Sequence, residues 1–135
     1  MAQKKKFLYL NRKAPHGTIY ALESLEVVLI GAAFEQDVSL AFLDDGVFQL
    51  MAGQDTAAAG MKNFSRTFKA LGDYDVRKFY VERESLAERG LKVEDLMPIT
   101  YEDENEDYAE KPSIHLVGRA ELAAIIAEQD VVLSF

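Results

Sequence analysis

Two adjacent carboxylates followed by a glycine are the first candidates for chemistry in this sequence. They follow residues 38–43, an apolar run without alternation that is typical of a strand buried on both faces of a parallel sheet. Asp44, Asp45 and Gly46 would then lie at its carboxyl end, where open α/β sheets bind their ligands. Gly46 is expected to adopt a positive φ in a tight turn. The alternative is that Asp44 caps the next short helix and Asp45 is solvated.

His16 and Glu82 are further candidates at this edge of the sheet. His16 stands in a loop with a proline and a glycine, after a predicted first strand at residues 7–10. It is either a general base or, as we favour, a loop histidine without a chemical role. Glu82 follows a predicted third strand at residues 76–81. The sequence has no cysteine and no nucleophile-elbow motif around a serine or threonine, so its residues alone predict no catalytic site.

The sequence also predicts no metal site and no cofactor. Residues 103–107 begin like a calcium-binding loop, but Tyr108 stands where that loop requires glycine and Ile114 where it requires glutamate. Two histidines without a cysteine disfavour a structural zinc site. The glycines are too scattered to form a phosphate-binding loop.

The composition is that of an acidic globular protein. The chain has 135 residues and a formal net charge of −8, which suggest one domain over residues 1–135 and argue against direct nucleic-acid binding. No apolar run is long enough for a membrane span. Residues 7–10 are too short for the apolar segment of a signal peptide, so a cytoplasmic protein is expected.

The elements that would position the candidate residues alternate between strands and helices. Strands are predicted at residues 7–10, 38–43, 76–81, 97–101 and 131–135, with a small extra strand at 114–117. Helices are predicted at residues 19–34, 47–51, 64–71 and 119–128. A further helical turn would begin with a capping box of Ser85 and Glu88 and end at Gly90, and residues 102–110 would form an acidic loop. This order predicts an α/β fold, a three-layer αβα sandwich with a mostly parallel sheet of about five strands.

The short helix at residues 47–51 supplies a candidate interface residue. Val47, Leu50 and Met51 would share one face of this helix, while Phe48 would point away from it. An aromatic side chain near the surface is a typical interface anchor. The alternative is that the loop at residues 52–60 covers Phe48.

Several motifs occur in the same order and spacing as in one known protein family. They are Ala-Pro-His-Gly at 14–17, Asp-Gly-Val-Phe-Gln-Leu at 45–50, Gly-Gln at 53–54, Thr-Phe-Lys at 67–69, Tyr-Asp at 74–75, and Ser-Leu with Glu-Arg-Gly-Leu at 85–91. Together they resemble the DsrE/DsrF family of small sulfur-relay proteins, and within it the DsrF/TusC branch. Residues 9–13 and 60–64 are more similar to DsrF, of intracellular sulfur oxidation, than to TusC, of tRNA thiolation.

The resemblance implies a DsrEFH-like, flavodoxin-like architecture and a place in a cytoplasmic heterohexamer. That assembly would contain DsrE-like and DsrH-like subunits, two copies of each of the three proteins, and would pass sulfur to a sulfur-carrier protein. In the DsrE-type subunit a cysteine just after the third strand carries the sulfur as a persulfide. The matching region here, residues 81–86, contains Glu82 and Arg83 but no cysteine. The resemblance therefore implies a non-catalytic subunit that supports a partner's cysteine.

Two alternatives remain open on the sequence. One is a TusC-like subunit of the sulfur relay that makes 2-thiouridine in tRNA. The other is a small hydrolase or ligand-binding enzyme that uses Asp44, Asp45 and His16 at the edge of the sheet.

Overall fold

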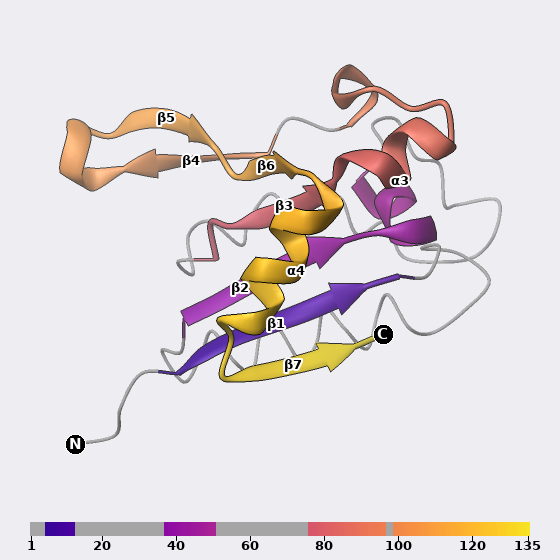
Figure 1. Ribbon diagram of the computed structural model, residues 1–135. Helices are drawn as coiled ribbons and strands as arrows, with labels where there is room; N and C mark the ends of the chain where they lie inside the picture. The colour runs from indigo at the N-terminus through magenta and orange to yellow at the C-terminus, as the bar shows by residue number, and fades with distance from the viewer. Residues whose placement is uncertain (1–4, 13–36, 51–75, 97–98) are drawn as a thin grey trace, which may run out of the picture.

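The computed structural model describes residues 5–12, 37–50, 76–96 and 99–135. Within these ranges the central element is a five-stranded parallel sheet of order β6-β3-β2-β1-β7 (Figure 1). Its strands are β1 (Lys6–Asn11), β2 (Asp37–Phe42), β3 (Phe79–Glu82), β6 (Ile114–Val117) and β7 (Val131–Ser134). The predicted α/β class and the parallel sheet of about five strands are confirmed.

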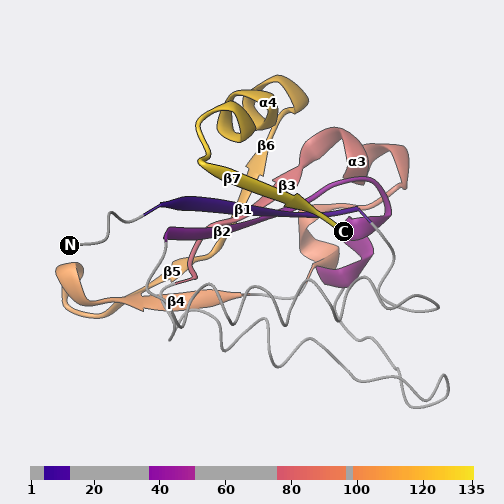
Figure 2. The ribbon, with the colours of Figure 1, turned by 90° about the horizontal axis from the view of Figure 1, so that it is seen from below.

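Helices and a hairpin surround this sheet. They are the 3₁₀ helices η1 (Asp44–Leu50), η3 (Val93–Asp95) and η4 (Glu104–Glu106), the α-helices α3 (Arg83–Glu88) and α4 (Arg119–Ala127), and the hairpin strands β4 (Thr100–Asp103) and β5 (Ala109–Pro112). Figure 2 shows α4 lying on one face of the sheet. The helices predicted at residues 19–34 and 64–71 lie outside the described residues. No helix in the described ranges is long and apolar enough to cross a membrane.

The burial of β2 on both faces explains why its mostly apolar sequence does not alternate with polar residues. The strand lies between β1 and β3, and its residues from Val38 onward are buried. Leu40 and Phe42 point into the larger core cluster, where Phe42 stacks on Phe79 at a centroid distance of 5.9 Å. Ala41 faces the other way, into the cluster under α4 that includes Leu122. A strand with a core on each face has no solvent-facing position, so a polar alternation is absent.

The acidic segment at residues 102–110, expected as a loop, is instead part of a β-hairpin: its ends lie in β4 and β5, and residues 104–108 form the connection between them. β4 and β5 pair antiparallel and form their own two-stranded sheet. Arg77, which precedes β3, contacts the acidic hairpin in two ways. Its guanidinium lies 4.7 Å from the ring centroid of Tyr101. It also donates hydrogen bonds to both carboxylate oxygens of Glu104, at 3.3 and 3.1 Å. Lys111 adds ion pairs to Asp103 and Glu106, at 2.8 and 2.9 Å.

Thr100 and Tyr101, from the strand predicted at residues 97–101, therefore belong to the hairpin and not to the main sheet. The place of that predicted strand in the main sheet is taken by β6, which had been predicted as a small extra strand. The third strand is also shorter than predicted, because it begins at Phe79 and not at residue 76.

Helix α3 begins earlier than the predicted capping box requires. It starts at Arg83, so Ser85 lies inside the helix and does not cap it. The predicted stop at Gly90 is confirmed, since Gly90 has a φ of 66°. Its N–H donates to the carbonyl of Ala87 at 3.1 Å, and the N–H of Leu91 donates to the carbonyl of Leu86 at 2.9 Å. These two bonds form a Schellman motif, which a glycine favours.

Candidate functional site

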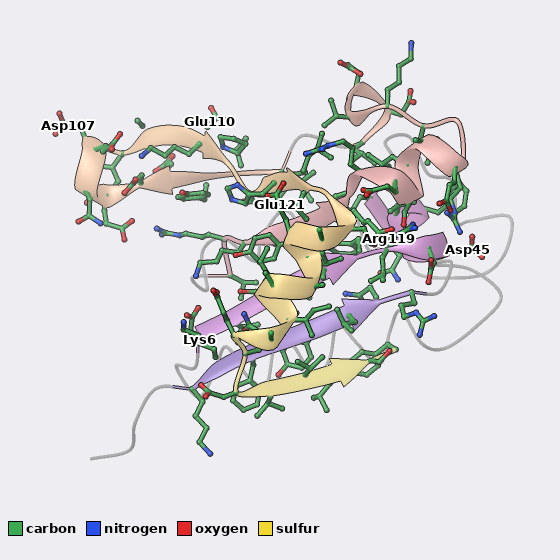
Figure 3. The ribbon with its side chains drawn as sticks, in the orientation of Figure 1. Lys6, Asp45, Asp107, Glu110, Arg119 and Glu121 are labelled. Atoms are coloured by element: carbon green, nitrogen blue, oxygen red, sulfur yellow. The ribbon has the colours of Figure 1, made fainter. Side chains whose placement is uncertain are left out.

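Polar side chains from several elements meet at the carboxyl edge of the parallel sheet. Arg12 follows β1, the two aspartates follow β2, Glu82 ends β3 and Arg119 begins α4 just after β6. Parallel strands bring these ends to one edge even though the residues are far apart in the sequence. Figure 3 shows Asp45 and Arg119 at this side of the molecule and Lys6 at the opposite end of the strands.

Glu82 is the centre of the site, and only 4% of its surface is exposed. One carboxylate oxygen, Oε1, accepts a hydrogen bond from Ser85 Oγ at 2.7 Å. The same oxygen accepts from Arg119 Nη2 at 2.9 Å and from Arg119 Nε at 3.3 Å. Arg119 Nη2 also donates to Glu88 at 3.1 Å. The bond to Glu82, followed by that to Glu88, raises the pKa of the Arg119 guanidinium above its ordinary value. The buried carboxylate therefore has a permanent cation beside it.

Ser85 links this buried carboxylate to the turn after β2. Its hydroxyl oxygen accepts the backbone N–H of Asp44 at 2.8 Å while its proton goes to Glu82. Asp44 has a φ of 51°, a left-handed conformation that aspartate tolerates better than most residues. Its carboxylate accepts from Arg12 Nε at 3.1 Å. Asp44 is thus the first residue of η1 and an ion-pair partner, and not the helix cap of the alternative interpretation.

Asp45 is also paired with an arginine. Arg89 Nε donates to Asp45 Oδ1 at 3.0 Å, and Arg89 Nη1 donates to the carbonyl of Ser85 at 3.1 Å. Each aspartate of the pair therefore meets an arginine from a different element, and the arrangement favours a structural role for both carboxylates.

Gly46 is required for a reason other than the predicted one. The left-handed residue of the turn is Asp44, and Gly46 is not among the residues with positive φ. Gly46 is buried against the end of β1, where a Cβ atom would overlap the carbonyl oxygen of Asn11 and lie 3.0 Å from the nitrogen of Arg12. The N–H of Leu43 donates to the same carbonyl at 3.2 Å, which holds the turn close to β1.

The remaining predicted site residues are not part of this network. Phe48 is half-buried on η1, whereas Val47 and Leu50 are fully buried, as the predicted shared face requires. Arg83 is exposed and lies 4.0 Å from Glu121 of α4. His16 lies outside the described residues.

Four residues of the network were missed by sequence reasoning: Arg12, Ser85, Arg89 and Arg119. Arg119 could have been predicted as a site residue if residues 114–117 had been placed in the main sheet, because Arg119 follows the carboxyl end of that strand. Ser85 and Arg89 are four residues apart, a spacing that puts both on one side of a helix.

A shallow depression of about 290 Å³ lies between this network and α4. Its lining residues are Leu43, Asp44, Glu82, Arg119, Leu122, Ala123 and Ile126. Its floor is apolar, and the carboxylate of Glu82 at its end is already bonded to Ser85 and Arg119. Within the described ranges no cluster of histidine, aspartate or glutamate could hold a metal ion. The polar side chains at this edge form hydrogen bonds and ion pairs that connect the ends of the strands to α3 and α4.

Glu84 joins α3 to the start of α4. Both of its carboxylate oxygens accept the backbone N–H of Arg119, at 3.1 and 2.9 Å. This N–H belongs to the first turn of α4 and has no partner within the helix. The bond, the largest of several causes, lowers the pKa of Glu84 below its ordinary value of 4.5.

This lowered pKa predicts a loss of stability in acid. A carboxylate with a lower pKa in the folded state stabilises the fold above its unfolded pKa and stops doing so as the pH falls through the folded value. Urea unfolding of the wild type from pH 7 downward should therefore show a decline that begins near the ordinary value of 4.5. Glu84→Gln should be less stable than the wild type at pH 7 and should show a flatter decline. The matched control is Glu94→Gln on exposed η3, and an equal flattening there would contradict the assignment.

Comparisons with known proteins identify the same family as the sequence motifs. A model of the DsrE/DsrF-like family matches residues 5–135. The protein named intracellular sulfur oxidation protein DsrF from Allochromatium vinosum is 56% identical over 131 residues, which cover 97% of this chain and 96% of that protein. The TusC homologue of Vibrio vulnificus is 40% identical over 89 residues, covering 66% of this chain and 75% of that protein.

A solved structure shares the fold. The crystal structure of the ychN protein from Escherichia coli superposes with a TM-score of 0.73 at 20% identity, covering 97% of this chain and 99% of that one. The family model and the DsrF relative both extend over nearly the whole chain, which confirms the resemblance found in the motifs. The chain belongs to the DsrE/DsrF-like family.

Proposed function

We propose that the chain is a non-catalytic subunit of a cytoplasmic sulfur-transfer complex that serves intracellular sulfur oxidation. The observation that carries this proposal is Glu82 at the end of β3, where the family pattern places the persulfide cysteine of DsrE-type subunits. Its carboxylate is buried and bonded to Ser85 and Arg119. The similarity to DsrF of Allochromatium vinosum supports the same function.

The chemistry of sulfur transfer explains why this chain needs partners. A persulfide forms when a thiolate accepts sulfane sulfur, and the sequence contains no cysteine. A carboxylate held by an arginine cannot replace that thiolate. The partners in this proposal are a DsrE-like subunit with the cysteine and a DsrH-like subunit, two copies of each, with a sulfur-carrier protein as the acceptor. The half-buried Phe48 would contribute to a contact with one of the subunits.

Co-expression tests this proposal. The tagged chain should purify with a DsrE-like and a DsrH-like protein from the same organism. After exposure of the complex to a persulfide donor, intact-mass measurement should show added sulfur on the DsrE-like subunit and none on this chain. A stoichiometric sulfur adduct on this polypeptide, or catalytic turnover by the isolated chain, would contradict the proposal.

The second candidate is a subunit of the tRNA 2-thiouridine relay, which the similarity to TusC homologues favours. Complementation separates the two functions. The chain should restore sulfur oxidation in a strain that lacks DsrF, and it should leave 2-thiouridine absent in a strain that lacks TusC. The reverse result would select the second candidate.

A further inference from the structure

Strand β7 is an open edge of the described part of the main sheet. It lies beside β1, at the opposite side of the sheet from β6 and the hairpin (Figure 1). Val132 and Leu133 are 37% and 38% exposed, although they point to opposite faces. Apolar side chains on both faces of an edge strand are covered most simply by another strand that continues the sheet.

This edge lacks the features that normally prevent strand pairing. Natural edge strands are protected by charged side chains, by proline or by a bulge. β7 has the sequence Val-Val-Leu-Ser, without a charge or a proline. The strand at the other edge is less open, because the segment before it is bound to the hairpin side through the N–H of Ser113, which donates to the carbonyl of Ile99 at 2.9 Å.

The backbone of β7 presents its free groups at defined positions. The N–H of Phe135 donates to the carbonyl of Leu10 at 2.9 Å, and the carbonyl of Phe135 accepts the N–H of Arg12 at 3.1 Å. The backbone groups of Phe135 therefore face β1. Successive residues of a strand alternate in this direction, so the N–H and C=O groups of Val132 and Ser134 face away from β1.

We propose that β7 pairs antiparallel with β7 of a second copy of this chain, with Val132 opposite Ser134 and the two-fold axis at Leu133. Residues whose backbone groups face outward can form the hydrogen-bonded pairs of an antiparallel ladder, and this register matches Val132 of each copy with Ser134 of the other. Leu133 then meets its own copy in a closely spaced pair without hydrogen bonds. The two sheets become one sheet of ten strands.

A second copy fits this edge because the edge is self-complementary, as a two-fold interface requires. The chain as a whole carries a net charge of −8, so contact between most other surfaces of two copies brings like charges together. Among the described residues, charges of both signs lie beside β7. Lys6 and Asp130 lie at its amino end, and Arg12 is paired with Asp44 near its carboxyl end. The inference rests on the proposed function in one respect, since a complex with two copies of this chain can be joined by a two-fold contact between them.

Charge placed on the axis tests the pairing. Leu133→Lys in the full chain puts two ammonium groups face to face in the proposed dimer, while the exposed position tolerates lysine in the monomer. Light scattering after size-exclusion chromatography should give twice the chain mass for the wild type and a single chain mass for the variant. The matched control is Val93→Lys on η3, where the side chain is 42% exposed, and it should remain dimeric.

A backbone variant and hydrogen exchange supply an independent readout. Val132→Pro removes an outward N–H and leaves the bonds to β1 in place, so it should also abolish the dimer. In the wild type the amides of Val132 and Ser134 should be protected from exchange, and Leu133→Lys should remove this protection. A wild-type chain that is monomeric and exchanges rapidly at both amides would overturn the inference.

The inference and the proposed function can fail separately. A chain that purifies with its partner subunits but occurs once per particle would overturn the pairing and the proposed stoichiometry, and would leave the role in sulfur transfer standing. A chain that dimerises through β7 but recruits neither partner would support the pairing and overturn the function.

Discussion

Gly46→Ala is expected to lower the free energy of unfolding by about 3 kcal/mol or more, at the upper end of the range for overpacking a buried site. The added Cβ would overlap the carbonyl oxygen of Asn11, and backbone atoms cannot move aside as the end of a flexible side chain can. This carbonyl also accepts the N–H of Leu43, so displacing it breaks the bond that holds η1 against β1. Urea unfolding monitored by circular dichroism measures the loss.

Two other glycines supply matched controls for this substitution. Gly90→Ala meets no atom within 4 Å but keeps a φ of 66°, so it should cost roughly 1 kcal/mol. Gly118→Ala has ordinary backbone angles and its nearest atom is at 3.8 Å, at the end of the Arg83 side chain, so its effect should be smaller still. A cost for Gly46→Ala no larger than that for Gly90→Ala would refute the close approach to Asn11.

The sequence could reveal where a glycine was needed, but not why. The Asp-Asp-Gly segment predicts a tight turn because of its residue types, and the turn is present. Its left-handed residue is Asp44, whose N–H is bonded to Ser85, 41 positions later in the chain. Local propensity contains no information on so distant a partner, so the positive φ was assigned to the wrong residue.

The main sheet could be predicted where hydropathy reports burial directly. β2 is enclosed on both faces, and its mostly apolar run without alternation indicates this position. The segments at residues 97–101 and 114–117 are both short and both contain apolar residues, and tertiary contacts decide which of them joins the sheet. The N–H of Phe79 donates to the carbonyl of Ser113 and so sets β6 beside β3, whereas Arg77 holds β4 in the hairpin.

In the candidate site, too, the contacts between residues distant in the sequence could not be predicted. The strand-end rule placed Glu82 and the two aspartates at one edge, as observed. The arginines that bond them lie 32, 37 and 44 positions away in the sequence. A carboxylate at a strand end can be a base, a metal ligand or half of an ion pair, and the partner decides among these.

Glu82→Ala is expected to lower the free energy of unfolding by about 2 kcal/mol. The substitution removes the acceptor of the Ser85 proton and leaves this fully buried hydroxyl as a donor without that partner. Glu82→Gln keeps an acceptor oxygen for Ser85 and should cost roughly half as much, since it loses only the charge facing Arg119. Chemical unfolding near pH 7 measures both values.

A double-mutant cycle then separates the ion pair from the hydrogen bond to Ser85. Arg119→Ala leaves the carboxylate of Glu82 buried without its cation and should destabilise the fold more than Glu82→Gln does. Adding Glu82→Gln to Arg119→Ala removes that buried charge, so the double variant should be at least as stable as Arg119→Ala alone. Arg83→Ala is the control on the same edge, because Arg83 and Glu121 are both exposed and 4.0 Å apart, and it should have almost no effect. Strictly additive losses for Glu82 and Arg119 would show that the two side chains do not act as a coupled ion pair. The link between Glu82 and the turn after β2 would then depend on Ser85 alone.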